Sequence, residues 1–192
     1  MSVGLFGGSF DPAHEGHAHV AKTAMRRLGL HRVVWLVSPQ NPLKRGRPPA
    51  SLARRMEGAR AFARGPGMIV SDLETRLGSV FTIDTLRTLK ARYPGVRFVW
   101  IMGSDSLANF HRWRGWRTIF REIPVAVVAR PQGLMKSRLA PAAQHFSYAR
   151  WPEREAKLLP YAAPPAWAFL GGRLHYASST ELRRQAIAAA AG

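Results

Sequence analysis

Short apolar runs alternate along this chain with segments whose apolar residues recur at helical spacing. The alternation predicts strands and helices in turn, and therefore an α/β fold with a doubly wound parallel sheet and helices on both faces. Strands are predicted at 3–6, 33–37, 68–71, 98–102, 125–129 and 167–170. Helices are predicted at 16–28, 52–64, 83–93, 118–121 and from 179 into the alanines near the end.

The length of 192 residues fits a single domain, 1–192, that can bury a sizeable core. The segment 133–166 has the weakest pattern, and we interpret it as one long excursion with a short helix near 153–158. No apolar run approaches the roughly 20 residues that span a bilayer, and the first residues do not resemble a signal peptide. Cysteine is absent, which excludes disulfides and thiolate metal sites. We expect a cytoplasmic protein with no membrane partner.

The charge is strongly basic, with 29 Lys and Arg against 11 Asp and Glu, a formal net charge of +18. Such a chain attracts polyanions, so a nucleic-acid-binding α/β module is an alternative from a different functional class. The basic residues are scattered, however, and no run of five or six like charges occurs. We therefore expect anionic small substrates and no nucleic-acid partner. The sequence leaves open whether the chain forms a homo-oligomer.

The first candidate site is the segment GGSFDPAHEGH at 7–17, which follows a predicted strand and precedes a predicted helix. Gly7 and Gly8 allow an anion to approach the backbone closely. The helix start offers unpaired N–H groups and a partial positive charge. A plain strand–turn–helix connection would explain the glycines but not both His14 and His17, whose imidazoles can donate to the same oxygens. The segment therefore predicts a phosphate site.

A metal site at His14, His17 and His19 is the competing interpretation of these histidines. His17 and His19 are two positions apart on a helix, so their side chains diverge. No cysteine or nearby carboxylate pair completes a ligand set. We expect no protein metal site here.

A second segment, SSTELRR at 178–184, opens the last predicted helix with hydroxyl side chains at capping positions. Together with GGSFDPAHEGH it resembles the nucleotidyltransferase superfamily, which transfers AMP or CMP from a nucleoside triphosphate, and within it the bacterial nicotinate-nucleotide adenylyltransferases. The resemblance runs from about 2 to 184 and implies a Rossmann-like sheet. It implies His14 and His17 as catalytic residues and an ATP site formed by Gly7, Gly8, Ser9, Phe10, His14, His17, Ser178, Ser179, Thr180 and Arg183.

The resemblance also implies a nicotinate mononucleotide site, formed by Lys44, Phe81, Thr82, Gly103, Asp105, Trp113 and Arg114. Thr82 stands near a helix N-terminus, whose amides would receive the pyridine carboxylate. Asp105 follows a strand and would bind ribose hydroxyls, while Trp113 would stack on the pyridine. Phe81 keeps the ring of the tyrosine common at this position but lacks its hydroxyl. Arg114 departs from the usual aromatic residue and would either contact an anionic group of the substrate or face water.

The implied reaction is attack of the phosphate of nicotinate mononucleotide on the α-phosphorus of ATP, with release of pyrophosphate. Catalysis would consist of positioning and charge neutralisation. His14 and His17 would donate to phosphate oxygens in a protonated form favoured by bound phosphate, and Arg183 and Lys44 would hold the triphosphate. Mg²⁺ would be held by substrate oxygens and water, with no dedicated protein ligand set. Nicotinamide mononucleotide and phosphopantetheine remain alternative acceptors.

Overall fold

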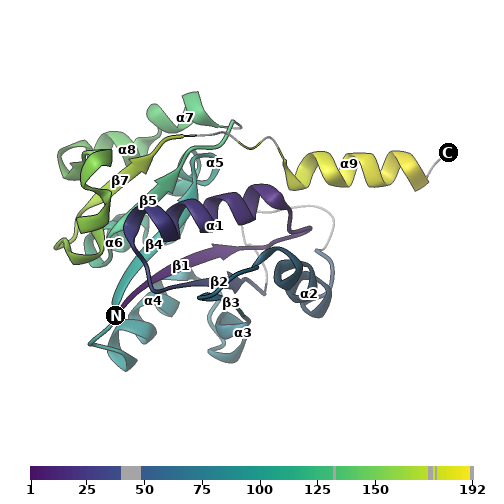
Figure 1. The fold of residues 1–192 in the computed structure, drawn as a ribbon, viewed down its shortest axis with the longest axis horizontal. Coiled ribbons are helices and arrows are strands. Elements are labelled where there is room, and N and C mark those ends of the chain that lie inside the picture. Colours follow the sequence, from purple (N-terminus) through teal and green to yellow (C-terminus); the bar gives the residue numbers. More distant parts are fainter. Residues whose placement is uncertain (40–48, 132, 173–174, 176, 191–192) are drawn as a thin grey trace.

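A computed structural model describes residues 1–39, 49–131, 133–172, 175 and 177–190 (Figure 1). These residues form a seven-stranded sheet in the order β3-β2-β1-β4-β5-β7-β6, and every neighbouring pair of strands is parallel. The strands are β1 (Ser2–Gly8), β2 (Arg32–Val37), β3 (Met68–Ser71), β4 (Arg97–Gly103), β5 (Val125–Val128), β6 (Arg150–Trp151) and β7 (Trp167–Leu170).

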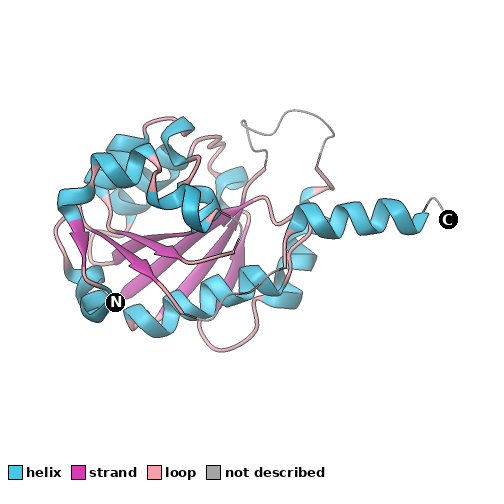
Figure 2. Ribbon diagram, turned by 90° about the horizontal axis from the view of Figure 1, so that it is seen from above, coloured by secondary structure: helices cyan, strands magenta, loops and turns pink. Residues whose placement is uncertain are grey.

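Helices cover both faces of this sheet (Figure 2). The α-helices are α1 (Glu15–Leu28), α2 (Leu52–Phe62), α3 (Leu73–Arg76), α4 (Thr82–Arg92), α5 (Ser104–Leu107), α6 (Trp116–Glu122), α7 (Leu134–Arg138), α8 (Pro141–His145) and α9 (Ser179–Ala190). Shorter 3-10 helices are η1 (Phe110–Arg112), η2 (Ser147–Ala149) and η3 (Glu153–Tyr161). The sheet and its two helical layers confirm the predicted α/β fold. No helix among the described residues is long and apolar enough to cross a membrane.

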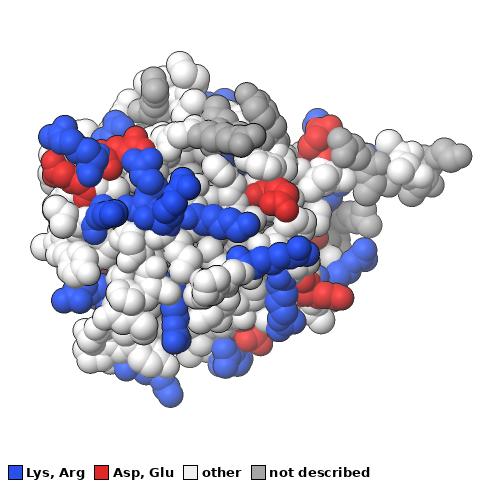
Figure 3. All heavy atoms as spheres, viewed as in Figure 1, with Lys and Arg blue, Asp and Glu red and all other residues white. Residues whose placement is uncertain are grey.

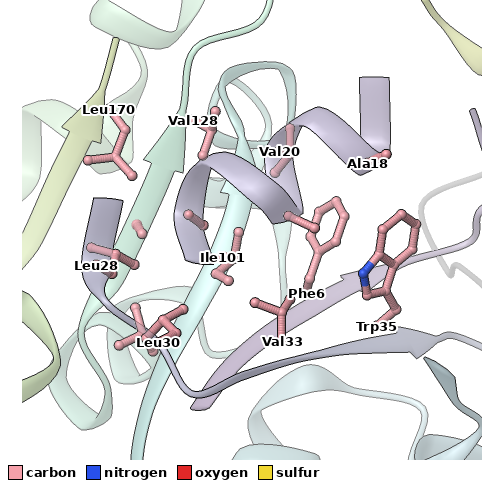
Figure 4. Close-up of a cluster of buried hydrophobic side chains, with 14 of the residues drawn as sticks. Phe6, Ala18, Val20, Leu28, Leu30, Val33, Trp35, Ile101, Val128 and Leu170 are labelled. Atoms are coloured by element: carbon pink, nitrogen blue, oxygen red, sulfur yellow. The ribbon is translucent and has the colours of Figure 1, made fainter. Parts of the chain in front are cut away.

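Two apolar layers hold the sheet to its helices, one on each face. On one face, α1 places Val20 and Leu28 against side chains of the central strands, including Val33 and Ile101 (Figure 4). On the other face, the helices α4 and α6 pack against the opposite sides of the same strands. Side chains that alternate between the two faces of buried strands produce this double core.

Helix α1 is fixed at both ends by local interactions. His14 is its N-cap, and the side chain of His14 accepts a hydrogen bond from the Gly16 amide. Gly29 ends the helix in a left-handed conformation with φ 61°, and its amide donates to the Met25 carbonyl. The helix therefore begins at a defined residue, which places both histidines of the first motif at its N-terminus.

The strand order reverses between β1 and β4, which lie side by side at the middle of the sheet. From β1 the chain moves outward through β2 and β3, then returns to β4 and continues in the opposite direction. Ligands of open parallel sheets bind beyond the carboxyl ends of strands at such a reversal. The first motif follows β1 and the segment around Gly103 follows β4, so both reach this crevice.

The predicted strands and helices are all present, with ends within two residues of those expected. The short helix expected near 153–158 is the 3-10 helix η3. The segment 133–166 also contains α7, α8 and β6, and the short helices α3 and α5 were likewise not predicted. These elements have two to five residues each, too few to establish a periodic pattern in the sequence.

Candidate active site

A cavity of about 950 Å³ lies at the carboxyl ends of β1 and β4. Its lining comes from the first motif, from the 178–184 segment, and from the segments that follow β4 and precede α4. Every residue expected in the site that belongs to the described part of the chain lines this cavity. Lys44, expected beside the phosphates, belongs to 40–48 and lies outside the described residues.

The two histidines of the first motif are oriented by backbone amides. The Gly16 amide donates to Nδ1 of His14 over 3.0 Å, and the His14 amide donates to Nδ1 of His17 over 3.3 Å. A ring nitrogen that accepts a hydrogen bond carries no proton, so the proton of each neutral ring is on Nε2. The ring centroids are 3.9 Å apart. The pair therefore presents two Nε2–H donors from adjacent rings.

His14 is uncharged in the free site. Burial, followed by the positive charges of Arg130 and His175, lowers the pKa of His14 to about 4. Its Nε2 is buried and has no hydrogen-bond partner among the described residues. A buried polar group without a partner costs about 1–3 kcal/mol, which a ligand oxygen would recover. The protonated form expected with bound phosphate is not the state of the free site, where His14 is a neutral donor.

An ion pair between the buried Arg130 and the half-buried Asp105 connects two sides of the cavity. Nη1 of Arg130 donates to Oδ2 of Asp105 over 3.0 Å, and Nη2 donates to the Ala177 carbonyl over 2.9 Å. The Oγ of Ser104 receives the Arg130 amide and donates to the Arg130 carbonyl. Oδ1 of Asp105 and Nε of Arg130 are buried without partners among the described residues. Together with Nε2 of His14, they give the cavity three unpaired polar atoms that a ligand can bind.

The 178–184 segment meets the first motif although the two are far apart in sequence. Ser179 Oγ donates to the Pro12 carbonyl over 3.0 Å, and Arg183 donates to the Asp11 carbonyl. Ser178 Oγ accepts from the Glu181 amide and caps the first turn of α9. The first turn of α9 is thus attached to the site, while the rest of the helix extends away from the sheet (Figure 1).

The opposite end of the cavity is aromatic. Phe81 occupies the N-cap position of α4 and Thr82 is the first residue of that helix. The Arg114 guanidinium lies 4.4 Å from the centroid of the Phe81 ring, a cation–π contact. Trp113 and Trp116 both pack against the core, but only Trp113 also lines the cavity. Cation, aromatic faces and helix N-terminus together suit a planar anionic ligand.

The cavity lining also contains charged residues that the sequence analysis did not assign to the site: Glu74, Arg112, Arg130, Glu181 and Arg184. Arg130 stands two residues after the end of β5, so its place at the carboxyl end of a central strand was an available signal. Glu74 lies on α3 and is only 5% exposed, and burial raises its pKa to about 7. Nothing in the sequence around Glu74 indicates that its side chain is buried.

The described residues contain no group of three or more His, Cys, Asp or Glu side chains placed to hold a metal ion. Basic side chains are spread over the face of the molecule covered by α1, with acidic side chains among them (Figure 3).

The chain is similar to two curated bacterial proteins over most of its length. It is 66% identical over 183 residues to a Caulobacter protein (strain K31), covering 95% of this chain and 97% of that protein. It is 53% identical over 183 residues to a Cereibacter sphaeroides protein (strain ATCC 17023), covering 95% and 96%. Each of these relatives is named "Probable nicotinate-nucleotide adenylyltransferase".

The fold is also that of a solved structure, the Plasmodium falciparum nicotinic acid mononucleotide adenylyltransferase complexed with NaAD. The TM-score is 0.68 at 17% sequence identity, with 95% of this chain and 82% of that chain covered. The family model described as Cytidylyltransferase-like matches residues 5–185. Because the sequence match spans nearly the whole chain and the two motifs meet at one cavity, the chain belongs to the nicotinate-nucleotide adenylyltransferases of the cytidylyltransferase-like family.

Proposed function

We propose that the cavity transfers AMP from ATP to nicotinate mononucleotide, giving nicotinate adenine dinucleotide and pyrophosphate in NAD biosynthesis. The observation that carries this proposal is the convergence of the two motifs and the aromatic segment on one cavity. The name shared by relatives up to 66% identical supports it. Nε2 of His14 also supports the proposal, because this buried donor has no acceptor among the described residues.

ATP would occupy the part of the cavity lined by the first motif and the first turn of α9. The backbone of Gly7, Gly8, Ser9 and Phe10 would approach the phosphates, with Ser178, Ser179, Thr180 and Arg183 on the other side. A side chain at Gly7 would collide with Trp100, because an added Cβ would lie 2.4 Å from Cη2 of that ring. Glycine there lets the end of β1 pack closely against the Trp100 ring.

Nicotinate mononucleotide would occupy the aromatic end. The first amides of α4, at Thr82, have no partner within the helix and would receive the pyridine carboxylate. Trp113 would stack on the ring, with Phe81 and Arg114 beside it. Asp105 would use its unpaired Oδ1 to accept from ribose hydroxyls. Glycine at 103 leaves room for that oxygen, which would lie 2.4 Å from an added Cβ.

In the reaction, a phosphate oxygen of the acceptor forms a bond to the α-phosphorus of ATP. The bond from that phosphorus to the bridging oxygen breaks, and pyrophosphate leaves with the electron pair. The attacking oxygen is already ionised near neutral pH, so the protein needs no general base. His14 and His17 would donate from Nε2 to phosphate oxygens, which stabilises the charge that develops there. Arg183 would hold the triphosphate, as would Lys44.

Mg²⁺ is the expected metal, and it would reduce the negative charge of the ATP phosphates. Its ligands would be phosphate oxygens and water, which Mg²⁺ commonly keeps when it binds nucleotides. The described residues fit this arrangement, because their cavity offers donors for the phosphates that would carry the ion.

The test is release of pyrophosphate from ATP with nicotinate mononucleotide, nicotinamide mononucleotide or phosphopantetheine as acceptor. We expect a strong preference for the first. A preference for another acceptor would contradict the roles given to Thr82 and Trp113. No release with any acceptor would contradict the proposal and favour the nucleic-acid alternative, whose binding would fall steeply with salt.

A matched pair of variants tests the aromatic end. Trp113→Ala should raise the KM for nicotinate mononucleotide by about tenfold, because a stacked ring is worth about 1–3 kcal/mol by substitution, and should leave the KM for ATP near normal. Trp116→Ala is the control, since Trp116 lies outside the cavity lining. Equal losses for both substrates in Trp113→Ala would indicate a packing role instead.

A further inference from the structure

Helix α2 carries a buried arginine that belongs to neither motif. Arg55 is 3% exposed, although its neighbour Arg54 is exposed to solvent. Arg55 donates four hydrogen bonds, and all four acceptors are backbone carbonyls. They are Ala50 at 2.9 Å from Nε, Ser9 at 2.9 Å and Ser38 at 2.7 Å from Nη1, and Pro39 at 3.0 Å from Nη2.

This arrangement depends on the shape of the arginine side chain. A planar guanidinium directs several N–H groups at fixed angles, so it can bind separate carbonyls at once, which a lysine ammonium cannot match. Burial lowers the pKa of Arg55, and the negative charge of Asp11 opposes that change. A buried cation that uses its donors on backbone carbonyls fixes the course of the chain segments that carry them.

Two of these carbonyls belong to residues of the cavity wall. Ser9 and Ser38 both line the cavity, whereas Arg55 does not. Ser9 precedes Phe10 in the first motif, and Ser38 directly follows β2. Arg55 therefore joins the end of β1 to the end of β2 from behind the cavity, through backbone groups only.

The Ser9 contact fixes the direction of one amide. In a trans peptide the C=O and N–H groups point in opposite directions, so the Ser9 carbonyl that faces Arg55 turns the Phe10 N–H away from it. Phe10 has φ 47°, a left-handed conformation that non-glycine residues adopt at a cost. The residue as a whole is 1% exposed, and its ring packs edge-on against Phe6. The Arg55 contact and this packing together hold Phe10 in the unfavourable conformation.

We propose that Arg55 is a positioning residue for ATP, which holds the Ser9–Phe10 peptide so that the Phe10 N–H faces the phosphates. It acts through the Ser9 carbonyl and does not touch substrate. The proposal rests on the proposed function, since the ligand it invokes is ATP. It assigns to α2 a part in the phosphate site, although α2 contributes no side chain to the cavity lining.

The experiment compares Arg55→Gln and Arg55→Lys with Arg60→Gln, a control at an exposed position of the same helix. Arg55→Gln should raise the KM for ATP by about tenfold, the effect of losing one oriented hydrogen bond to a charged group, and leave the KM for nicotinate mononucleotide within about twofold. The KM of Arg55→Lys for ATP should lie between those of Arg55→Gln and the wild type, because lysine keeps the charge but lacks the planar set of N–H donors. Arg60→Gln should match the wild type.

A purely structural role would give a different result. Either a lower unfolding midpoint with both KM values unchanged, or an equal rise in both KM values, would overturn the proposal. If the wild type releases no pyrophosphate, the proposed function fails by itself, and calorimetric binding of ATP to the same variants then decides about Arg55.

A second measurement covers the case in which Arg55→Gln does not fold. Hydrogen exchange of the Phe10 amide is followed in the wild type and in Arg55→Lys, with and without ATP. We expect ATP to slow this exchange strongly in the wild type and more weakly in Arg55→Lys. No protection of the Phe10 amide by ATP in the wild type would overturn the proposal.

Discussion

The buried carboxyl of Glu74 should make the stability of the protein depend on pH. Glu74 is 5% exposed, and burial raises its pKa from 4.5 to about 7. The Glu74 carboxyl therefore binds its proton more tightly in the folded state than in the unfolded state. The resulting stabilisation is complete below pH 4.5 and is lost as the pH rises to about 7. At about 1.4 kcal/mol for each pH unit of that interval, the loss is about 3 kcal/mol.

Glu74→Gln keeps the size of the side chain and removes the titration. The free energy of unfolding of the variant, relative to the wild type, should rise by about 3 kcal/mol between pH 4.5 and pH 8. In a chain of this length that corresponds to a gap in melting temperature of roughly 6 to 12 °C. The assay is urea unfolding at closely spaced pH values, with Glu57→Gln, an exposed position on α2, as the control.

The result that would refute this reasoning is an identical pH dependence in the wild type and Glu74→Gln. It would mean that the carboxyl reaches water in the folded protein or finds a partner for its charge. A parallel offset at every pH would indicate a change in packing without any change in titration.

Three further variants test other parts of the site. His17→Ala should lower turnover by about 10²–10³-fold, the usual effect of losing a donor to developing charge, with the fold intact and a slightly lower unfolding midpoint, because the His14 amide loses its acceptor; steady-state kinetics near those of the wild type would contradict the mechanism. Ser104→Ala removes both hydrogen bonds to the Arg130 backbone and should cost about 1–3 kcal/mol in denaturant unfolding. Gly7→Ala forces a Cβ within 2.4 Å of the Trp100 ring and should destabilise by a similar amount, about 1–3 kcal/mol, with altered tryptophan fluorescence.

The parts of the site that the sequence predicted are those whose chemistry is local. His14, His17 and the glycines before them stand within 11 consecutive residues, between a strand and a helix that the apolar pattern predicts. The alternation of strands and helices was also sufficient to place 178–184 near the same end of the sheet. Local spacing and the general topology of parallel sheets therefore accounted for the first motif and the place of the cavity. The residues of the aromatic end, such as Thr82 and Trp113, were expected only from the resemblance to a known family.

The residues that the sequence did not reveal act over long distances in the chain. Arg55 looks like an ordinary helical arginine, and only the fold brings it to Ser9, 46 positions away. Arg130, just after β5, donates to the carbonyl of Ala177, just before α9 and 47 positions away. Glu74 belongs to a helix of four residues, in which no periodicity can separate a buried face from an exposed one. Tertiary contacts decide the roles of these side chains.

The bridge made by Arg130 has a consequence for how the two substrates influence one another. One guanidinium binds Asp105, on the proposed acceptor side, and the Ala177 carbonyl, which precedes the proposed ATP-binding turn of α9. A substrate whose ribose binds Asp105 would change the ion pair between Asp105 and Arg130. It would thereby also affect the hydrogen bond from Arg130 to the Ala177 carbonyl. Thermodynamic linkage makes such coupling reciprocal, so whatever factor ATP imposes on the affinity for nicotinate mononucleotide, the mononucleotide imposes on the affinity for ATP. A single ion pair would then make the affinity for each substrate depend on the presence of the other.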